Sequence, residues 1–216
     1  MPVITVSRQT GSGGATIGTR LAEQLGADYL DTRIIREVAH RLGISEATAA
    51  ASSERAEAFT ERLARVLWLS EPALGAVLHP ADGVPFESTT RAIVEVTRQL
   101  VREVAGTGNA VIFGHGAQFI LAEHPGVLHV RFVAPFPMRV ERVMRRKAIG
   151  RAEAERWVRE EDQRRKDHIR QFYQAEWGAP EPFHLILNTT LLSEESCVRL
   201  IMHAVDEINR PPSEGA

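Results

Sequence analysis

The 216-residue sequence has one cysteine, few aromatic residues (6%) and almost no net charge. A single cysteine excludes an intrachain disulfide, and we expect a protein of the reducing cytoplasm. That residue, Cys197, lies in an apolar helical pattern with Val198 and Ile201, which favours a buried side chain over a reactive thiol. The net charge of −2 gives no overall attraction to nucleic acid or to an anionic membrane, so any polyanion site must be local.

The sequence also lacks an apolar run of membrane-spanning length, and its first residues do not resemble a secretory signal, so no membrane partner is expected. The eight histidines show no zinc-type spacing. With 44% hydrophobic residues, the chain is long enough for one sizeable core. These observations predict a single α/β domain with a flap or two, and leave the oligomeric state open.

A glycine-rich loop follows the first predicted strand, Val3–Val6. After it comes a helical pattern with apolar residues at Ile17, Leu21 and Leu25. Glycines let backbone N–H groups converge, and the next helix adds its positive dipole end, so this order predicts a phosphate cradle. A flexible turn is the alternative, but a position just after the first buried strand favours phosphate binding. The predicted cradle consists of Gly11, Ser12, Gly13, Gly14, Ala15 and Thr16.

This loop departs from the usual P-loop pattern G-x-x-x-x-G-K-[ST]. With Gly13 on the second glycine, Gly14 stands in the lysine position and Ala15 in the hydroxyl position. Ser12 and Thr16 are then the candidate ligands of Mg²⁺. Arg8 is the nearest cation, and we expect it to bend back over the loop and partly replace the lysine. The alternative is that Arg8 caps the sheet edge with its charged group in water.

A second strand and helix are expected at residues 27–31 and 34–42. Asp31 can cap that helix and Arg36 follows on it, either as a solvated basic face or as an end that contacts substrate. Residues 45–70 predict two helical segments, and the prolines and glycines of 71–86 predict a loop or flap. A helix from residue 88 should end near residue 106, followed by a buried strand at 110–113. His115 lies in the glycine turn after this strand, where open α/β sheets hold ligands.

A basic run follows the next predicted strand, residues 127–133. Helices are expected from residue 138 and again after residue 150, and residues 139–170 hold twelve basic and seven acidic side chains. Arg139, Arg142 and Arg146 share one helical face. The run is either a solvated face or a phosphate clamp, and the cradle upstream favours the clamp because guanidinium groups match phosphate oxygens in pairs. A last strand is expected at 183–188, a closing helix at 193–208, and a disordered tail at 211–216.

Several segments together resemble the cytidylate kinase-like family of nucleoside monophosphate kinase-like P-loop proteins. The resemblance covers nearly the whole chain and is weakest between about 45 and 90. The matching segments are Ile4-Thr5-Val6-Ser7-Arg8, Gly11-Ser12-Gly13-Gly14, Leu21-Ala22-Glu23-Gln24-Leu25-Gly26, Tyr29-Leu30-Asp31, Val111-Ile112-Phe113-Gly114-His115-Gly116-Ala117, Arg139-Val140-Glu141-Arg142-Val143-Met144, Asp162-Gln163-Arg164-Arg165, Trp177-Gly178 and Leu187-Asn188-Thr189-Thr190.

The resemblance implies a P-loop NTPase-like, three-layer α/β/α fold with a parallel central sheet. It implies a core of residues 1–44, 88–140 and 183–210, a helical substrate-binding insertion at about 45–87 and a basic helical lid at about 141–178. On this view Asp31 and Arg36 belong to the monophosphate side, and the lid arginines bind the phosphate being moved. The family turn usually reads glycine–arginine where this chain has Gly114-His115. The family also lacks the loop lysine, which leaves the activity open.

Two functions from different classes follow. The first is a phosphotransferase that binds ATP and Mg²⁺ in the loop, takes a small nucleotide such as CMP near His115, and neutralises the moving group with Arg142, Arg146, Arg164 and Arg165. The second is a nucleotide-binding or regulatory module without turnover. A nucleic-acid binder is disfavoured by the negative net charge and the lack of aromatic residues within the basic run.

Overall fold

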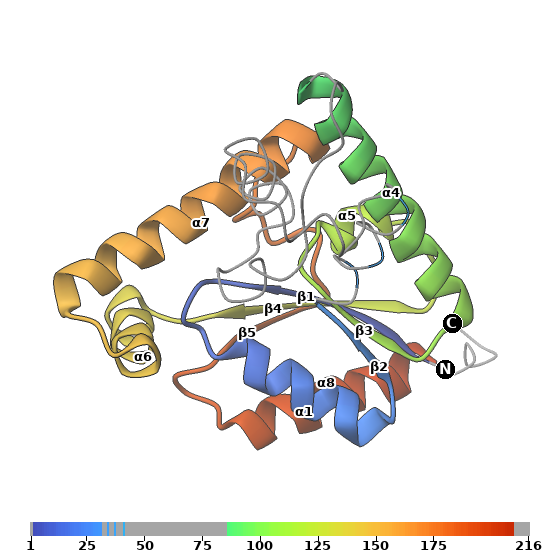
Figure 1. Ribbon diagram of the computed structural model, residues 1–216. Coiled ribbons are helices and arrows are strands. Elements are labelled where there is room, and N and C mark those ends of the chain that lie inside the picture. The colour runs from blue at the N-terminus through green and yellow to red at the C-terminus, as the bar shows by residue number, and fades with distance from the viewer. Residues whose placement is uncertain (1, 32–33, 35–36, 38–40, 42–85, 210–216) are drawn as a thin grey trace.

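The computed structural model describes residues 2–31, 34, 37, 41 and 86–209, with the backbone alone for 86–92. Its centre is a sheet of five parallel strands in the order β2-β3-β1-β4-β5, so the first strand lies in the middle (Figure 1). The strands are β1 (Val3–Arg8), β2 (Asp28–Leu30), β3 (Ala110–Phe113), β4 (Val127–Val133) and β5 (Leu185–Asn188).

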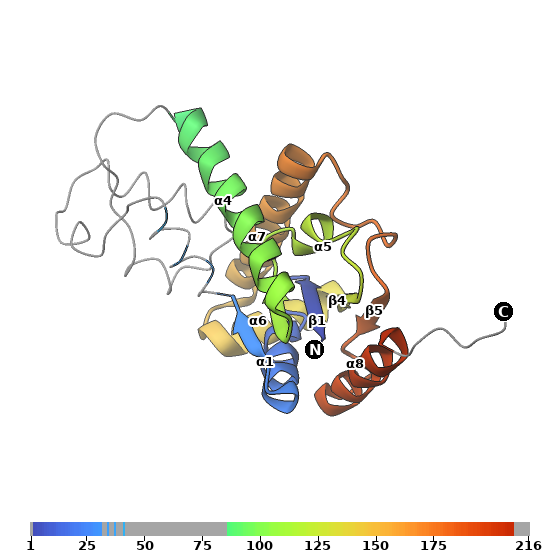
Figure 2. The ribbon, with the colours of Figure 1, turned by 90° about the vertical axis from the view of Figure 1, so that its right-hand side faces the viewer.

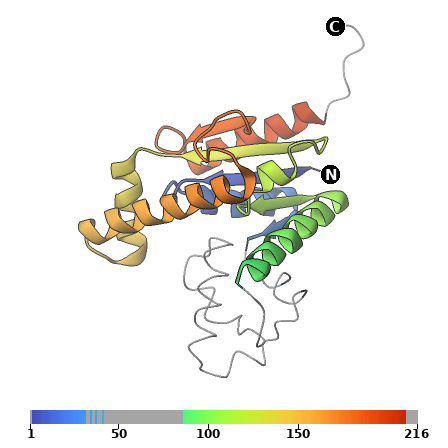
Figure 3. The same cartoon turned by 90° about the horizontal axis from the view of Figure 1, so that it is seen from above.

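Helices cover both faces of this sheet. Helices α1 and α8 pack on one face, whereas α4, α5 and α7 lie over the other (Figure 2). Viewed from above, α7 lies over the strands, and α6 stands beside them (Figure 3). The helices are α1 (Gly14–Leu25), α4 (Phe86–Thr107), α5 (Ala117–Ile120), α6 (Phe136–Lys147), α7 (Arg151–Tyr173) and α8 (Glu194–Ile208). The predicted three-layer α/β/α fold with a parallel sheet is confirmed.

The core follows from the alternation of side chains along the strands. On β1, Ile4 and Val6 face α1 and α8, where they pack in a cluster with Leu21 and Ile201. Val3 faces α4 on the other side. Further along that face, Thr5 and Ser7 are buried polar residues that bond to side chains of β4, Thr5 to His129 and Ser7 to Arg131. All five strands end at the same edge of the sheet, so the segments that follow them meet there.

Most elements begin and end close to the predicted residues. The strands at 110–113 and 127–133 have the predicted bounds, and Ser193 caps α8 by accepting a hydrogen bond from the Ser196 N–H. Cys197 is fully buried, as expected, and burial raises the pKa of its thiol. The short helix α5 was not predicted. The predictions for residues 45–85 and 211–216 lie outside the described residues, and so does most of the helix expected at 34–42. Within the described chain, no helix has both the length and the apolar character needed to cross a membrane.

Candidate functional site

The loop that follows β1 is held open by its own backbone. Gln9 donates to the Phe132 carbonyl (3.1 Å) and accepts from the Ser12 N–H (3.1 Å), which fixes the start of the turn. Gly11 and Gly13 adopt left-handed φ angles of 77° and 84°, which side chains other than glycine rarely tolerate. Helix α1 begins at the next residue and has no side-chain cap. Its first N–H groups and its positive dipole end are therefore available to an anion.

A cavity of about 320 Å³ opens beside this loop. Its lining comes from the loop, from α6 and from the segment after β5, and consists of Gly11, Ser12, Gly13, Thr16, Ile17, Arg142, Arg145, Arg146, Thr189, Leu192 and Glu194. The Ser12 hydroxyl oxygen is buried and has no hydrogen-bond partner among the described residues. A buried polar atom without a partner is costly, so this atom fits a ligand that would complete it.

Gly14 is required by close packing at the lysine position of the loop. A Cβ added there would lie 2.7 Å from Cδ2 and 3.0 Å from Cβ of Phe132. Phe132 is fully buried on β4, so its ring has no room to move away. The cavity must therefore receive its positive charge from outside the loop.

Arg142 on α6 supplies charge at the rim of the cavity. Its guanidinium donates to the Ser12 carbonyl (2.8 Å), to the Thr189 hydroxyl (2.8 Å) and to the Thr189 carbonyl (2.9 Å). These bonds join α6, the loop and the end of β5. Arg145 and Arg146 also line the cavity and are exposed. The sequence singled out Arg142 and Arg146, and both lie at the cavity.

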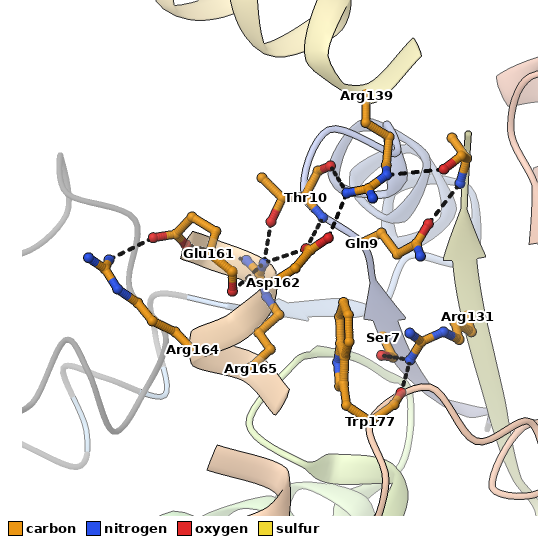
Figure 4. Close-up of polar contacts among 11 residues, drawn as sticks. Ser7, Gln9, Thr10, Arg131, Arg139, Glu161, Asp162, Arg164, Arg165 and Trp177 are labelled. Atoms are coloured by element: carbon orange, nitrogen blue, oxygen red, sulfur yellow. Dashed lines mark hydrogen bonds and ion pairs between the residues drawn. The ribbon is translucent and has the colours of Figure 1, made fainter. Parts of the chain in front are cut away.

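Arg139 lies one turn earlier and is buried. It donates to the carbonyls of Ala134 (3.0 Å) and Thr10 (3.1 Å) and pairs with the Asp162 carboxylate at 2.6 Å (Figure 4). Asp162 also accepts a hydrogen bond from the Thr10 N–H at 2.9 Å. Arg139 and Asp162 thus fasten the middle of α7 to the start of the loop.

Arg165, one turn further along α7, is buried in the same cluster. It donates to the Thr10 hydroxyl and lies 3.5 Å from Asp162 and 3.7 Å from Glu161. Burial and the charge of Arg8 lower the pKa of Arg165 to about 10, against the opposing effect of the nearby carboxylates. Arg164 is half exposed and pairs with Glu161 at 2.8 Å. Neither Arg164 nor Arg165 lines the loop cavity.

Another arginine, Arg131, fixes the segment between α7 and β5. Arg131 donates to the Trp177 carbonyl (2.6 Å) and the Ser7 hydroxyl (3.3 Å), and it stacks on the Trp177 ring at 4.4 Å (Figure 4). Burial lowers the pKa of Arg131 to about 10. This anchoring of the chain that leaves α7 makes Arg131 a structural arginine beneath the site.

The other flank of β1 carries a different group of residues. Arg8 lies 3.6 Å from the Asp31 carboxylate and 4.7 Å above the Phe113 ring. This is not the placement expected from the sequence, because Arg8 turns toward β2 and β3 and is absent from the lining of the loop cavity. His115 is buried nearby, with Nε2 3.3 Å from the Asp31 carbonyl and with Nδ1 unpartnered among the described residues. Burial lowers the pKa of His115, so the ring is neutral near pH 7.

The end of α7 packs on the turn that holds His115. The Tyr173 hydroxyl donates to the His115 carbonyl at 2.9 Å, and the Tyr173 ring stacks on Phe119 of α5 at 5.3 Å. Burial raises the pKa of Tyr173 to about 12. His168 lies beside Tyr173, and burial is the main cause that lowers its pKa to about 3. Helix α7 therefore contacts both flanks of the sheet edge.

The structure divides the predicted site residues into two groups. The loop, Arg142 and Arg146 meet at the cavity, whereas Arg8, Asp31 and His115 meet on the other flank. Arg36 lies outside the described residues. The predicted site residues did not include Arg145, Thr189 or Asp162. Arg145 belongs to the recognised basic run, but only the fold brings Thr189 to the loop.

A parallel sheet in this strand order, with a glycine loop between the central strand and α1, defines a P-loop NTPase-like α/β/α protein. The family is also defined, because the model of the cytidylate kinase-like family matches residues 3–191. The chain belongs to that family.

The chain is similar to individual proteins over different shares of their length. The chain is 30% identical over 200 residues to a cytidylate kinase of Aeropyrum pernix, covering 91% of this chain and 95% of the relative. It is 31% identical over 137 residues to a uronate isomerase of Corynebacterium glutamicum, where the match covers 62% of this chain but only 26% of that protein.

Two solved structures share the fold. A protein from Eubacterium ventriosum has a TM-score of 0.68 at 16% identity, covering 97% of this chain and all of its own. Shikimate kinase from Bacteroides thetaiotaomicron has a TM-score of 0.51 at 15% identity, covering 95% of this chain and 98% of its own. At these identities the likeness concerns the fold alone.

Proposed function

We propose that the protein is an ATP-dependent phosphotransferase of the nucleoside monophosphate kinase type, with CMP as the first candidate acceptor. The observation that carries this proposal is the cavity at the glycine loop, with its buried Ser12 hydroxyl and its three arginines. Membership in the cytidylate kinase-like family supports it, as does the relative named cytidylate kinase.

The phosphates of ATP bind to the backbone N–H groups of residues 11–16 at the start of α1. The hydroxyls of Ser12 and Thr16 would hold Mg²⁺ at this site. Both hydroxyl-bearing residues line the cavity, and no three His, Cys, Asp or Glu side chains of the described chain gather as a separate metal site. The metal neutralises phosphate charge during transfer.

Transfer forms a bond between an acceptor phosphate oxygen and the γ-phosphorus of ATP while the bond from that phosphorus to the ADP oxygen breaks. This step needs positioning and charge neutralisation and no covalent enzyme intermediate. Because Gly14 excludes a lysine, these roles fall to arginines, with Arg142 and Arg146 at the cavity. Arg164 and Arg165 act from α7, within the proposed lid of residues 141–178.

The acceptor occupies the flank formed by the ends of β2 and β3. Asp31 and His115 provide hydrogen-bond acceptors there, and Arg36 completes this side together with the proposed insertion at 45–87. The two sites then lie on opposite sides of β1. This arrangement places the two nucleotides with their phosphates facing each other across the loop.

A coupled assay for ADP formation tests the proposal. The protein is supplied with ATP and Mg²⁺, and with CMP, UMP, dCMP, AMP or GMP in turn. We expect acceptor-dependent ADP formation, fastest with CMP. A rate that no monophosphate raises above the acceptor-free rate would contradict the proposal.

A nucleotide-binding module without turnover is the second candidate. The observation that favours it is the contact between Gly14 and Phe132, which leaves no room for the lysine that most P-loop enzymes place there. ATP binding by calorimetry, combined with no ADP formation across the panel, is the outcome expected for this candidate.

A further inference from the structure

Arg8 differs from the other arginines packed around the loop in the hydrogen bonds that its N–H groups make. Arg131, Arg139, Arg142 and Arg165 each donate hydrogen bonds to protein oxygens. No described residue accepts a hydrogen bond from Arg8, although its side chain is only 23% exposed. These four arginines use some of their N–H groups within the chain, whereas Arg8 holds a donor set that the described chain does not use.

Arg8 is nevertheless held in place. Its guanidinium stacks on the fully buried Phe113 ring and lies 3.6 Å from the Asp31 carboxylate, which is too long for a hydrogen bond. A partly exposed ion pair of this kind stabilises little by itself, and stacking on the ring adds to it. The side chain is therefore ordered before any ligand binds, and a doubly charged phosphate competes readily with Asp31 for its N–H groups.

A second cation lies nearby on α7, because Arg165 donates to the hydroxyl of Thr10, two residues after Arg8 in the chain. The charge of Arg8 is the largest electrostatic cause that lowers the pKa of the buried Arg165, so the two guanidinium groups repel each other. An anion between them would relieve this repulsion. The neutral His115 adds no positive charge on this flank.

We propose that Arg8 binds the phosphate of the acceptor nucleotide, with Arg165 on the opposite side of that phosphate. This assignment rests on the proposed function in one respect, that the acceptor is a nucleoside monophosphate. In this assignment Arg8 binds the acceptor nucleotide and not ATP. The positive charge that binds the acceptor phosphate then lies on β1 and not on the turn after β3.

The test compares the two ligands on one set of variants by titration calorimetry. Arg8→Gln removes the charge and keeps a polar side chain of moderate length, and Arg8→Lys keeps the charge but removes the planar pair of donors. Arg199→Gln, on the exposed face of α8, is the matched control. Each protein is titrated with CMP and, separately, with ATP and Mg²⁺.

We expect Arg8→Gln to weaken CMP binding at least tenfold while ATP binding stays within twofold of wild type. Arg8→Lys should give a CMP affinity between these values, and the control should match wild type. A variant that merely distorts the site would weaken both ligands together. Loss of ATP affinity with CMP affinity unchanged, or no change in either, would overturn the assignment.

The ADP assay on the same proteins separates this assignment from the proposed function. Arg8-dependent CMP binding without ADP formation overturns the phosphotransferase and leaves the Arg8 assignment standing. If the protein turns over CMP, and Arg8→Gln changes neither the rate of ADP formation nor the affinity for CMP, the Arg8 assignment alone is overturned. A wild-type protein that binds no monophosphate overturns both.

Discussion

The Phe132 ring lies so close to Gly14 that a side chain cannot be accommodated between them: an added Cβ would lie 2.7 Å from Cδ2 of the ring. Phe132 belongs to β4 and Gly14 to α1, and Phe132 is part of the core between the sheet and helices α1 and α8. Packing in the core therefore requires glycine at position 14, and the absence of the loop lysine is not a change confined to the loop surface.

This contact predicts the outcome of restoring the lysine. Gly14→Lys should lower the free energy of unfolding by about 1–3 kcal/mol, the usual effect of forcing extra atoms into a packed core. Urea denaturation measures the change. Gly106→Lys is the matched control, because a Cβ at Gly106 meets nothing within 4 Å. The control should be neutral or stabilising by up to about 1 kcal/mol, since glycine is a poor helix former. Equal effects at both positions would contradict the packing argument.

Arg142 should be required for turnover if the protein is a kinase. Arg142→Ala removes three hydrogen bonds that join α6 to Ser12 and Thr189, together with a charge at the cavity. We expect the rate of ADP formation to fall tenfold or more, which corresponds to about 1.4 kcal/mol or more of transition-state stabilisation. Arg156→Ala, on an exposed part of α7, is the control and should retain the wild-type rate. An unchanged rate in Arg142→Ala would assign this residue a structural role alone.

The buried pair of Arg139 and Asp162 should be strongly coupled. Removing one partner leaves an uncompensated buried charge, so Arg139→Gln and Asp162→Asn should each destabilise the protein by about 3–5 kcal/mol. The double variant should be less destabilised than the two single changes together, by about 0.5–3 kcal/mol. Chemical denaturation of all four proteins gives this coupling. Strict additivity would contradict a direct interaction.

Stability should fall as the solution is acidified below about pH 6.5, the ordinary pKa of histidine. Burial lowers the folded-state pKa of His129 to about 4 and of His168 to about 3. Between these values and about 6.5 the unfolded chain binds protons that the folded chain does not, so stability rises with pH by up to about 1.4 kcal/mol per unit for each histidine. This contribution is complete above about pH 6.5.

The measurement is the free energy of unfolding between pH 4.5 and pH 7 for wild type and His168→Gln. The variant should show a shallower slope, because one of the buried histidines has been removed and no longer titrates. His203→Gln, on the exposed face of α8, should keep the wild-type slope. A slope in His168→Gln as steep as in wild type would mean that His168 is already protonated in the folded protein. The residues whose charges act on His168 are His115 and Arg98.

The sheet could be predicted because local signals were strong. Continuous apolar runs such as 110–113 are typical of strands buried on both faces, and each is bounded by glycine or proline. The loop was equally visible, since its glycines follow the first strand directly. The four-residue helix α5 carried no comparable periodic signal, because a single turn shows no repeat.

The division of the arginines could not be predicted, because sequence spacing does not show which oxygens surround a side chain. Arg139 and Arg142 share a helical face, yet Arg139 is enclosed by Thr10, Ala134 and Asp162, whereas Arg142 reaches the cavity. The direction of Arg8 depended on Asp31 and Phe113, which only the order of the strands brings beside it.

The bond from the Thr10 N–H to Asp162 joins the glycine loop to a helix residue 152 positions later in the chain. Helix α7 cannot leave the sheet edge without exposing this amide to water. Deuterium exchange at Thr10 therefore measures how often the helix detaches, without any label on the helix itself. A nucleotide that stabilises the contact of α7 with the loop would slow that exchange, and one that weakens the contact would speed it. A single backbone amide proton therefore reports whether α7 is attached to the sheet edge.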